Sequence, residues 1–163
     1  MNTADVLKYG HQTVTRTLDG LAEANWETGG VCGVWSVKDI IGHLAAYEHM
    51  LEEILAPFAG MKIEMPTMNQ LGQIGIGAFN DVQAEARKTK SANDVRVEYN
   101  ETCTRIMEQI VPKIPAEIWA KNGTLPWYGA EYALDDYIVY TFYGHKREHC
   151  AQINVFKDTL KPA

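Results

Sequence analysis

The sequence is poor in the features that mark disulfide-rich, membrane-spanning and nucleic-acid-binding proteins. It has three cysteines, an odd number without paired spacing, so reduced thiols in a cytosolic protein are the simplest expectation. The longest uncharged run, residues 65–80, contains Asn, Gln and several Gly and is therefore no membrane span. Lys and Arg total 15 against 21 Asp and Glu, a balance that argues against nucleic acid or an anionic membrane as a partner.

The chain also lacks signs of a secretory signal, a repeat or a disordered composition. Residues 1–6 contain neither a basic nor an apolar signal region. Hydrophobic residues make up 46% and charged residues 22% of the sequence, as in ordinary globular proteins. Because a chain of 163 residues fits one domain and can bury a sizeable core, we expect a single domain over residues 1–163, located in the cytoplasm.

Four stretches repeat apolar residues every three or four positions, the pattern of an amphipathic helix, and no alternating strand pattern is found. These stretches cover about 3–24, 36–57, 91–111 and 134–160. Ser36 with Asp39 and Ser91 with Asp94 are capping-box pairs that favour helix starts at both serines. Residues 59–69 are predicted to be a connection, and the Gly-rich, then polar, segment 70–90 a loop with a short or irregular helix. The pattern predicts an all-α four-helix bundle.

Two histidines interrupt the apolar stripe of the last predicted helix. His145 and His149 are separated by four residues, so both imidazoles project from one helix face, as in pairs that bind one metal ion. Burying them is costly unless their nitrogens find partners, and either a metal or a network of polar side chains would meet that need. His43 lies on a core-directed face of the second helix and is the natural third ligand. Three imidazoles with an open position are typical of catalytic metal sites. The alternative is three separate histidines bonded to backbone or carboxylates.

The other chemically versatile side chains are expected to have ordinary roles more often than functional ones. His11 lies in the stripe of the first helix and is either packed in or beside the core, or a ligand or proton-transfer group. His49 is predicted to be solvated, and Glu48 and Glu148 to be surface charges rather than ligands. Cys150 is either a reactive thiol beside a histidine or, more often in such a position, a packed small hydrophobe.

Two short motifs carry a resemblance to a known superfamily. Residues 35–44 read Trp-Ser-Val-Lys-Asp-Ile-Ile-Gly-His-Leu, which is similar to the W-S-x-x-[DE]-x-x-x-H-L signature of the DinB/YfiT-like superfamily. Residues 145–153 read His-Lys-Arg-Glu-His-Cys-Ala-Gln-Ile, which resembles that superfamily's H-x-x-x-H-x-x-Q-[IL] motif. The sequence Trp-Ser-Val-Lys-Asp at residues 35–39 is especially similar to sequences of the ClbS/DfsB branch. The likeness spans most of the chain through helix order and is specific in these two motifs.

The resemblance implies a bundle of up-down-down-up type, commonly dimeric, in which three histidines hold a divalent metal. Carried over by motif, these ligands are His43, His145 and His149, and zinc or nickel is the expected ion. Characterised relatives include transferases and isomerases that use low-molecular-weight thiols, and a resistance enzyme that opens a reactive cyclopropane. The chain departs from the commonest form at Glu148, where a further histidine often stands, and at residues 150–151, where Arg-Gly is frequent. These departures leave the ligands intact but argue against the thiol-transferase branch.

Three functions are consistent with these residues. The first is a metal-dependent hydrolase or thiol-dependent transferase acting on a small, reactive or toxic molecule, with a metal that lowers the pKa of water or a thiol. Tyr47 and Gln152 would orient the substrate or bound water in such an enzyme, although each is equally consistent with a packing role. The second is a non-catalytic protein that binds or sequesters a small molecule in an aromatic cavity, for which the candidate residues are Trp35, Trp127, Tyr128 and Phe142. The third is an interaction protein with a vestigial metal site.

Overall fold

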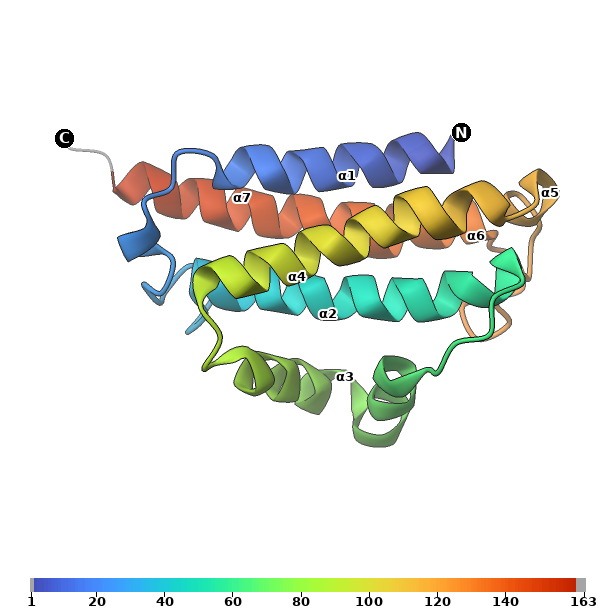
Figure 1. Ribbon diagram of the computed structural model, residues 1–163, viewed down its shortest axis with the longest axis horizontal. Coiled ribbons are helices and arrows are strands. Elements are labelled where there is room, and N and C mark those ends of the chain that lie inside the picture. Colours follow the sequence, from blue (N-terminus) through green and yellow to red (C-terminus); the bar gives the residue numbers. More distant parts are fainter. Residues whose placement is uncertain (1, 161–163) are drawn as a thin grey trace.

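A computed structural model describes residues 2–160, in which four helices lie side by side and form a bundle (Figure 1). They are α1 (Thr3–Leu18), α2 (Val37–Leu55), α4 (Ala92–Arg105), and a last helix made of α6 (Leu134–Tyr137), a π-helical segment (Ile138–Tyr143) and α7 (Gly144–Thr159). α2 and α4 run in one direction, and α1 and α7 run in the other. This order confirms the predicted all-α, up-down-down-up four-helix bundle.

The predicted helix starts at Ser36 and Ser91 are confirmed as capping boxes. The Ser36 hydroxyl accepts a hydrogen bond from the Asp39 amide at 3.2 Å, and the Ser36 amide donates to the Asp39 carboxylate at 2.9 Å. Ser91 and Asp94 make the corresponding bonds at 3.1 and 3.2 Å. These bonds satisfy amide groups that have no partner inside the first turn of each helix. The start of the helix that carries His43 is therefore set by local sequence.

The first helix is shorter than the sequence pattern predicts. The prediction that it continues to about residue 24 is wrong, since α1 ends at Leu18 and a short 3₁₀ turn (Glu23–Asn25) follows. Gly20 adopts a φ of 74°, a left-handed conformation that glycine tolerates and that ends helices. Leu21 continues the apolar spacing of the helix from a loop position, which explains why periodicity alone placed the end too late.

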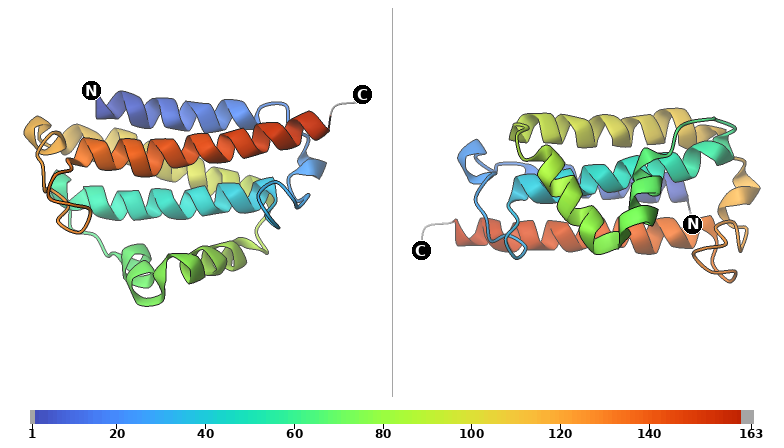
Figure 2. Two further views of the ribbon diagram at one scale, coloured as in Figure 1. Left: turned by 180° about the vertical axis from the view of Figure 1, so that it is seen from behind. Right: turned by 90° about the horizontal axis from the view of Figure 1, so that it is seen from below.

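The segment predicted as a connection and then a loop with a short or irregular helix forms a long, kinked helix, α3 (Pro66–Arg87), which packs along α2 (Figure 2). Pro66 suits the first turn of a helix, and Gly75, with φ 76° and ψ 165°, kinks the helix in its middle. The buried Glu53 carboxylate of α2 accepts the Thr67 and Met68 amides at 2.9 and 2.7 Å. This cap, together with the fully buried Phe79, compensates for the low helix propensity of the glycines.

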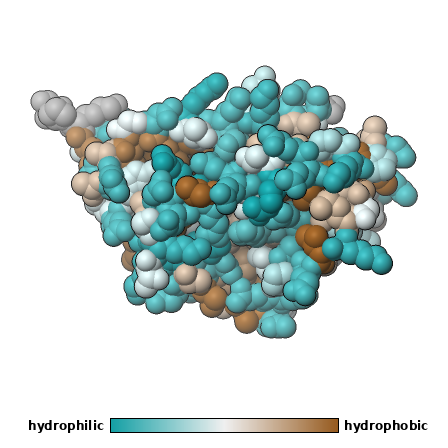
Figure 3. Space-filling model, viewed as in Figure 1, coloured by the Kyte–Doolittle hydropathy of each residue, from teal (hydrophilic) through white to brown (hydrophobic). Residues whose placement is uncertain are grey.

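Shorter helical pieces complete the part of the chain that the structure describes. A π-helical segment (Ile106–Ile110) and a 3₁₀ turn (Val111–Lys113) extend α4 over the predicted range, and α5 (Ala116–Trp119) follows. A 3₁₀ turn (Ala56–Ala59) follows α2. Between residues 2 and 160, no helix is both long and apolar enough to cross a membrane. The face in Figure 3 is mostly hydrophilic.

The core consists of two hydrophobic clusters that both include residues of α2. Leu51, Leu55 and Phe142 belong to the first, and Ile40, Leu44 and Ile153 to the second. Because α2 packs against α3, α4 and α7, nearly all its side chains are buried, His43 included. A histidine on this helix therefore faces the interior of the protein.

Glu98 joins α4 to the end of α3, and we predict that its replacement makes stability less dependent on pH. Its carboxylate receives hydrogen bonds from Arg87 at 2.6 Å, Lys90 at 2.9 Å and His49 at 3.2 Å. Although burial alone would raise the pKa of Glu98, these three bonds hold its pKa well below the usual range. The stabilisation is therefore present above the unfolded-state pKa near 4.5 and is lost as the pH falls below it.

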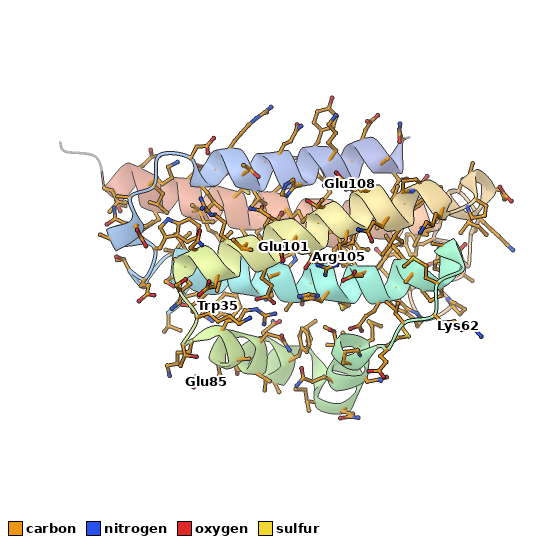
Figure 4. The ribbon with its side chains drawn as sticks, in the orientation of Figure 1. Trp35, Lys62, Glu85, Glu101, Arg105 and Glu108 are labelled. Atoms are coloured by element: carbon orange, nitrogen blue, oxygen red, sulfur yellow. The ribbon has the colours of Figure 1, made fainter. Side chains whose placement is uncertain are left out.

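We expect Glu98→Gln to lower the free energy of unfolding at pH 7 by about 1–3 kcal/mol, because hydrogen bonds to a charged group are lost. The difference from the wild type should shrink at pH 3.5, as measured by urea unfolding. Glu101→Gln, an exposed position on the same helix, is the control (Figure 4). An equal loss at both pH values would contradict the prediction.

Candidate metal centre

The structure brings the three predicted ligands together at one point. His43 Nε2 of α2 lies 2.8 Å from His145 Nε2 of α7, and His149 Nε2 lies 3.0 Å from the same atom. The three imidazole rings meet nearly edge to face or at steep angles, with centroids 4.7–5.0 Å apart. His43 and His149 are buried, and His145 is half-buried. Side chains from two antiparallel helices thus form a three-nitrogen group that has the geometry to hold a metal ion.

All three imidazoles are held in the neutral form that coordination requires. Burial lowers the pKa of His43 to about 3, with a further contribution from the other two histidines. Burial, together with the neighbouring His149, lowers the pKa of His145 to about 4, and burial also lowers the pKa of His149. At neutral pH, each ring therefore has one nitrogen lone pair available.

Gln152 selects which nitrogen of His149 carries that lone pair. Its amide oxygen lies 2.8 Å from His149 Nδ1, and because this oxygen only accepts, Nδ1 carries the proton. His149 Nε2, which faces the other two histidines, is then unprotonated. A hydrogen bond of this kind, which orients a histidine and increases its basicity, is a regular feature of metal sites. Gln152 is thus placed to orient the His149 ring.

The donor set fits a divalent transition metal. Imidazole nitrogen is a preferred ligand for zinc, nickel, copper and iron, and three such nitrogens leave a position open in a tetrahedral site. Without an ion, His145 Nε2 can carry or accept only one proton for its two contacts with His43 Nε2 and His149 Nε2, and His149 Nε2 has none to give. One of the two contacts therefore lacks a hydrogen bond. His43 Nδ1 is also buried without a hydrogen-bond partner. A metal would use the lone pairs that otherwise face one another.

Two aromatic side chains form the walls of this site. The Tyr47 ring lies 4.6 Å from the rings of both His43 and His145, and its hydroxyl donates a long hydrogen bond of 3.5 Å to Asn80 of α3. The Trp35 ring lies 4.9 Å from the His43 ring, in the space between α2 and α3 (Figure 4). Burial raises the pKa of Tyr47, so its hydroxyl stays protonated and able to donate.

The other aromatic residues proposed to line a cavity belong to different surroundings. Trp127 and Tyr128 pack against Tyr137 with ring centroids 5.3 and 4.7 Å away, and Phe142 is a buried core residue. Of the four candidates, Trp35 is the one whose ring contacts the histidines. The structure therefore supports a core or loop-packing role for the other three.

The remaining chemically versatile residues lie outside the histidine group. His11 is half-buried beside the Tyr99 ring, and Cys150 is buried, with burial raising the pKa of its thiol. Both observations favour packing roles. Glu148 is exposed, as predicted. The prediction that His49 is solvated is wrong in part, because its half-buried ring is hydrogen-bonded to Glu98 at 3.2 Å.

Sequence reasoning missed one feature next to the histidines. Glu48, predicted to be a surface charge, is 2% exposed and forms an ion pair of 2.8 Å with the equally buried Lys146. The spacing of apolar residues indicates that Glu48 is buried, because it lies between Leu44 and Leu51 on the apolar stripe of α2. Periodicity marks such a position as buried, but the partner that makes a buried carboxylate acceptable is on another helix.

Comparison with known proteins supports the fold and identifies the family. A crystal structure of a protein from Streptococcus pneumoniae superposes with a TM-score of 0.75 at 10% sequence identity, over 96% of this chain and 88% of that one. This likeness shows a shared fold. A search of curated proteins finds no match.

A family model matches residues 7–134, which include His43 but end before His145 and His149. The matched family is a DinB/YfiT-like helical family, in agreement with the resemblance of the two sequence motifs. Since the match spans most of the chain, the protein belongs to the mycothiol maleylpyruvate isomerase N-terminal domain family.

Proposed function

We propose that this protein is a metal-dependent enzyme of hydrolase or thiol-dependent transferase type, acting on a small and reactive molecule. The observation that carries the proposal is the convergence of His43, His145 and His149 through their Nε2 atoms, 2.8 and 3.0 Å apart. Zinc or nickel is the proposed ion, because imidazole ligands suit both. When bound, such an ion acts as a Lewis acid that lowers the pKa of water or of a thiol toward neutrality.

The protein's own residues would supply binding and orientation. Gln152 holds His149 in the tautomer that presents Nε2, through the bond of 2.8 Å. Tyr47 would donate its hydroxyl proton in a hydrogen bond to the substrate, because its present bond to Asn80 is long enough to be exchanged at little cost. Trp35 and Tyr47 would exclude water from one side of the site.

Two observations bear on whether the nucleophile is a thiol or water. The family's name includes a thiol, mycothiol, which supports a thiol cosubstrate. The departures from the superfamily pattern at Glu148 and Cys150 favour the hydrolase type instead. The three cysteines are free thiols, which agrees with the proposed cytoplasmic location. A homodimer, which the superfamily resemblance implies, stays a prediction.

Metal content tests the proposal. Protein purified without chelator or a metal-binding tag should contain about one zinc or nickel ion per chain by elemental analysis. His43→Ala should lose the metal, because removing one of three ligands costs more than the loss of a residue that only orients a ligand, which is about 10–100-fold in affinity. His49→Ala should retain the metal. A wild-type protein that takes up no divalent transition metal would refute the proposed site.

A second measurement separates catalysis from sequestration. With a reactive electrophile as probe, the wild type should show metal-dependent turnover, and His145→Ala should show none. Stoichiometric binding that persists in His145→Ala without turnover would instead establish the non-catalytic, sequestering function.

A further inference from the structure

The interior next to the histidines contains a buried ion pair that the proposed chemistry does not use. Lys146 Nζ lies 2.8 Å from Glu48 Oε1, and the two side chains are 3% and 2% exposed. Lys146 directly follows the ligand His145 on α7, and Glu48 lies five residues after the ligand His43 on α2. The pair therefore connects the same two helices that the metal site connects.

The other two helices of the bundle, α1 and α4, enclose this pair. On α1, Gly10 leaves room for the lysine stem, since a Cβ there would lie 3.3 Å from Lys146 Cδ. On α4, the Tyr99 ring lies 5.7 Å from Lys146 Nζ, and the Cys103 thiol donates a hydrogen bond of 3.4 Å to Glu48 Oε2. The ion pair is thus surrounded by residues of all four helices of the bundle.

Such a pair contributes little net stability, but each of its charges depends on the other. Removing two charges from water costs about as much as their attraction returns, so an apolar pair of similar volume is often equally stable. Apolar side chains such as Phe142, Cys150 and Ile153 on the last helix, in contrast, need no specific partner atom and are compatible with more than one register. A slide of one turn, about 5.4 Å, would leave Glu48 and Lys146 buried without partners. It would also separate His145 from His43.

We infer that the Glu48–Lys146 pair sets the register of α7 against α2 and so holds His145 and His149 opposite His43. Both are positioning residues, and neither is placed to contact a substrate. The inference deepens the proposed function and rests on it for its metal-binding readout. Its second readout, the contact between histidine rings, does not require a metal.

The test is a paired replacement of both charges by methionine, which conserves volume. Glu48→Met with Lys146→Met should keep the urea midpoint of the metal-free protein at or above that of the wild type. Zinc affinity, measured by competition with a chelating indicator, should nevertheless fall at least tenfold. The control is Glu52→Met with Arg105→Met, which removes an ion pair of 2.9 Å between α2 and α4 and should leave zinc affinity within about twofold.

Nuclear Overhauser contacts in the metal-free proteins report the register directly. The wild type should show a contact between the rings of His43 and His145, whose centroids are 4.8 Å apart, and the paired variant should lose it. The contact between His145 and His149, both on α7, should remain in both proteins as an internal reference.

A folded paired variant with unchanged zinc affinity and an unchanged contact from His43 to His145 would overturn the inference. If that variant does not fold, Glu48→Gln with Lys146→Met, which keeps a polar acceptor for Cys103, takes its place in the same comparison. A wild type that binds no zinc would refute the proposed function alone, since the ring contacts would still decide whether the pair sets the register.

Discussion

Lys146→Met alone should lower the free energy of unfolding by about 3–5 kcal/mol, the cost of leaving a buried charge without its partner. Although burial alone would lower the pKa of Lys146, the adjacent Glu48 raises it above the usual value, so the lysine is charged in the native protein. Its removal leaves a carboxylate that is 2% exposed, with the weakly donating Cys103 thiol as its remaining hydrogen-bond partner. Urea unfolding followed by circular dichroism measures the loss.

The pH dependence of this single variant identifies the cause. An unpaired buried carboxyl has a raised pKa in the folded state, so its protonation favours folding, and the deficit should shrink as the pH falls from 7 to 5. Lys88→Met removes an exposed pair with Glu85 and should change stability by less than about 0.5 kcal/mol. A loss below about 1 kcal/mol for Lys146→Met would show that the pair is not desolvated as the structure indicates.

Zinc should raise the stability of the wild type by about 4 kcal/mol when free metal is 1,000 times its dissociation constant. The effect arises because the folded protein presents three converged imidazoles and the unfolded chain does not. His145→Ala should lose most of this stabilisation, and Mg²⁺, which prefers oxygen ligands, should not replace zinc. Thermal unfolding with and without added metal provides the measurement.

The stabilisation by metal should decrease as the pH falls. Protons compete with metal for imidazole, and in the folded protein burial lowers the pKa of His43 to about 3 and of His145 to about 4. Metal binding should therefore persist well below pH 6.5, where ordinary histidines become protonated, and disappear as the pH approaches 4.

In the metal-free protein, the same lowered pKa values mean that the unfolded chain binds protons first. Stability should thus fall as the pH decreases from 6.5 toward 4. Metal binding that fades already between pH 7 and 6 would contradict the buried, neutral state of these histidines.

Features that depend on a few neighbouring residues, such as helix starts and the face from which a side chain projects, could be predicted from the sequence. The serine and aspartate of each capping box lie three residues apart, so the starts of α2 and α4 could be predicted. The four-residue spacing of His145 and His149 guarantees that both project from one helix face. His43 was expected at or near the core because it lies between Ile40 and Tyr47 on one face of its helix.

The predictions that the structure contradicts concern features that depend on residues far apart in the sequence. Over residues 70–90, the glycines at 72, 75 and 77 predict a loop with a short or irregular helix, whereas α3 runs from Pro66 to Arg87. Its first turn is capped by Glu53, thirteen residues before Pro66, and Phe79 is buried in the bundle core. Glu48 was predicted as exposed because carboxylates usually are. Its burial depends on Lys146, 98 positions later in the sequence, which no local pattern connects to it.

The sequence by itself thus determined the all-α class, the helices that carry the histidines and the identity of the three candidate ligands, because helix period and capping act over three to four residues. The tertiary structure alone decided that the three Nε2 atoms lie within 3.0 Å of a neighbour, that Gln152 selects the tautomer of His149, and that a buried charge pair spans α2 and α7. These features depend on the register between helices, and that register follows from packing and charge pairing across the whole bundle.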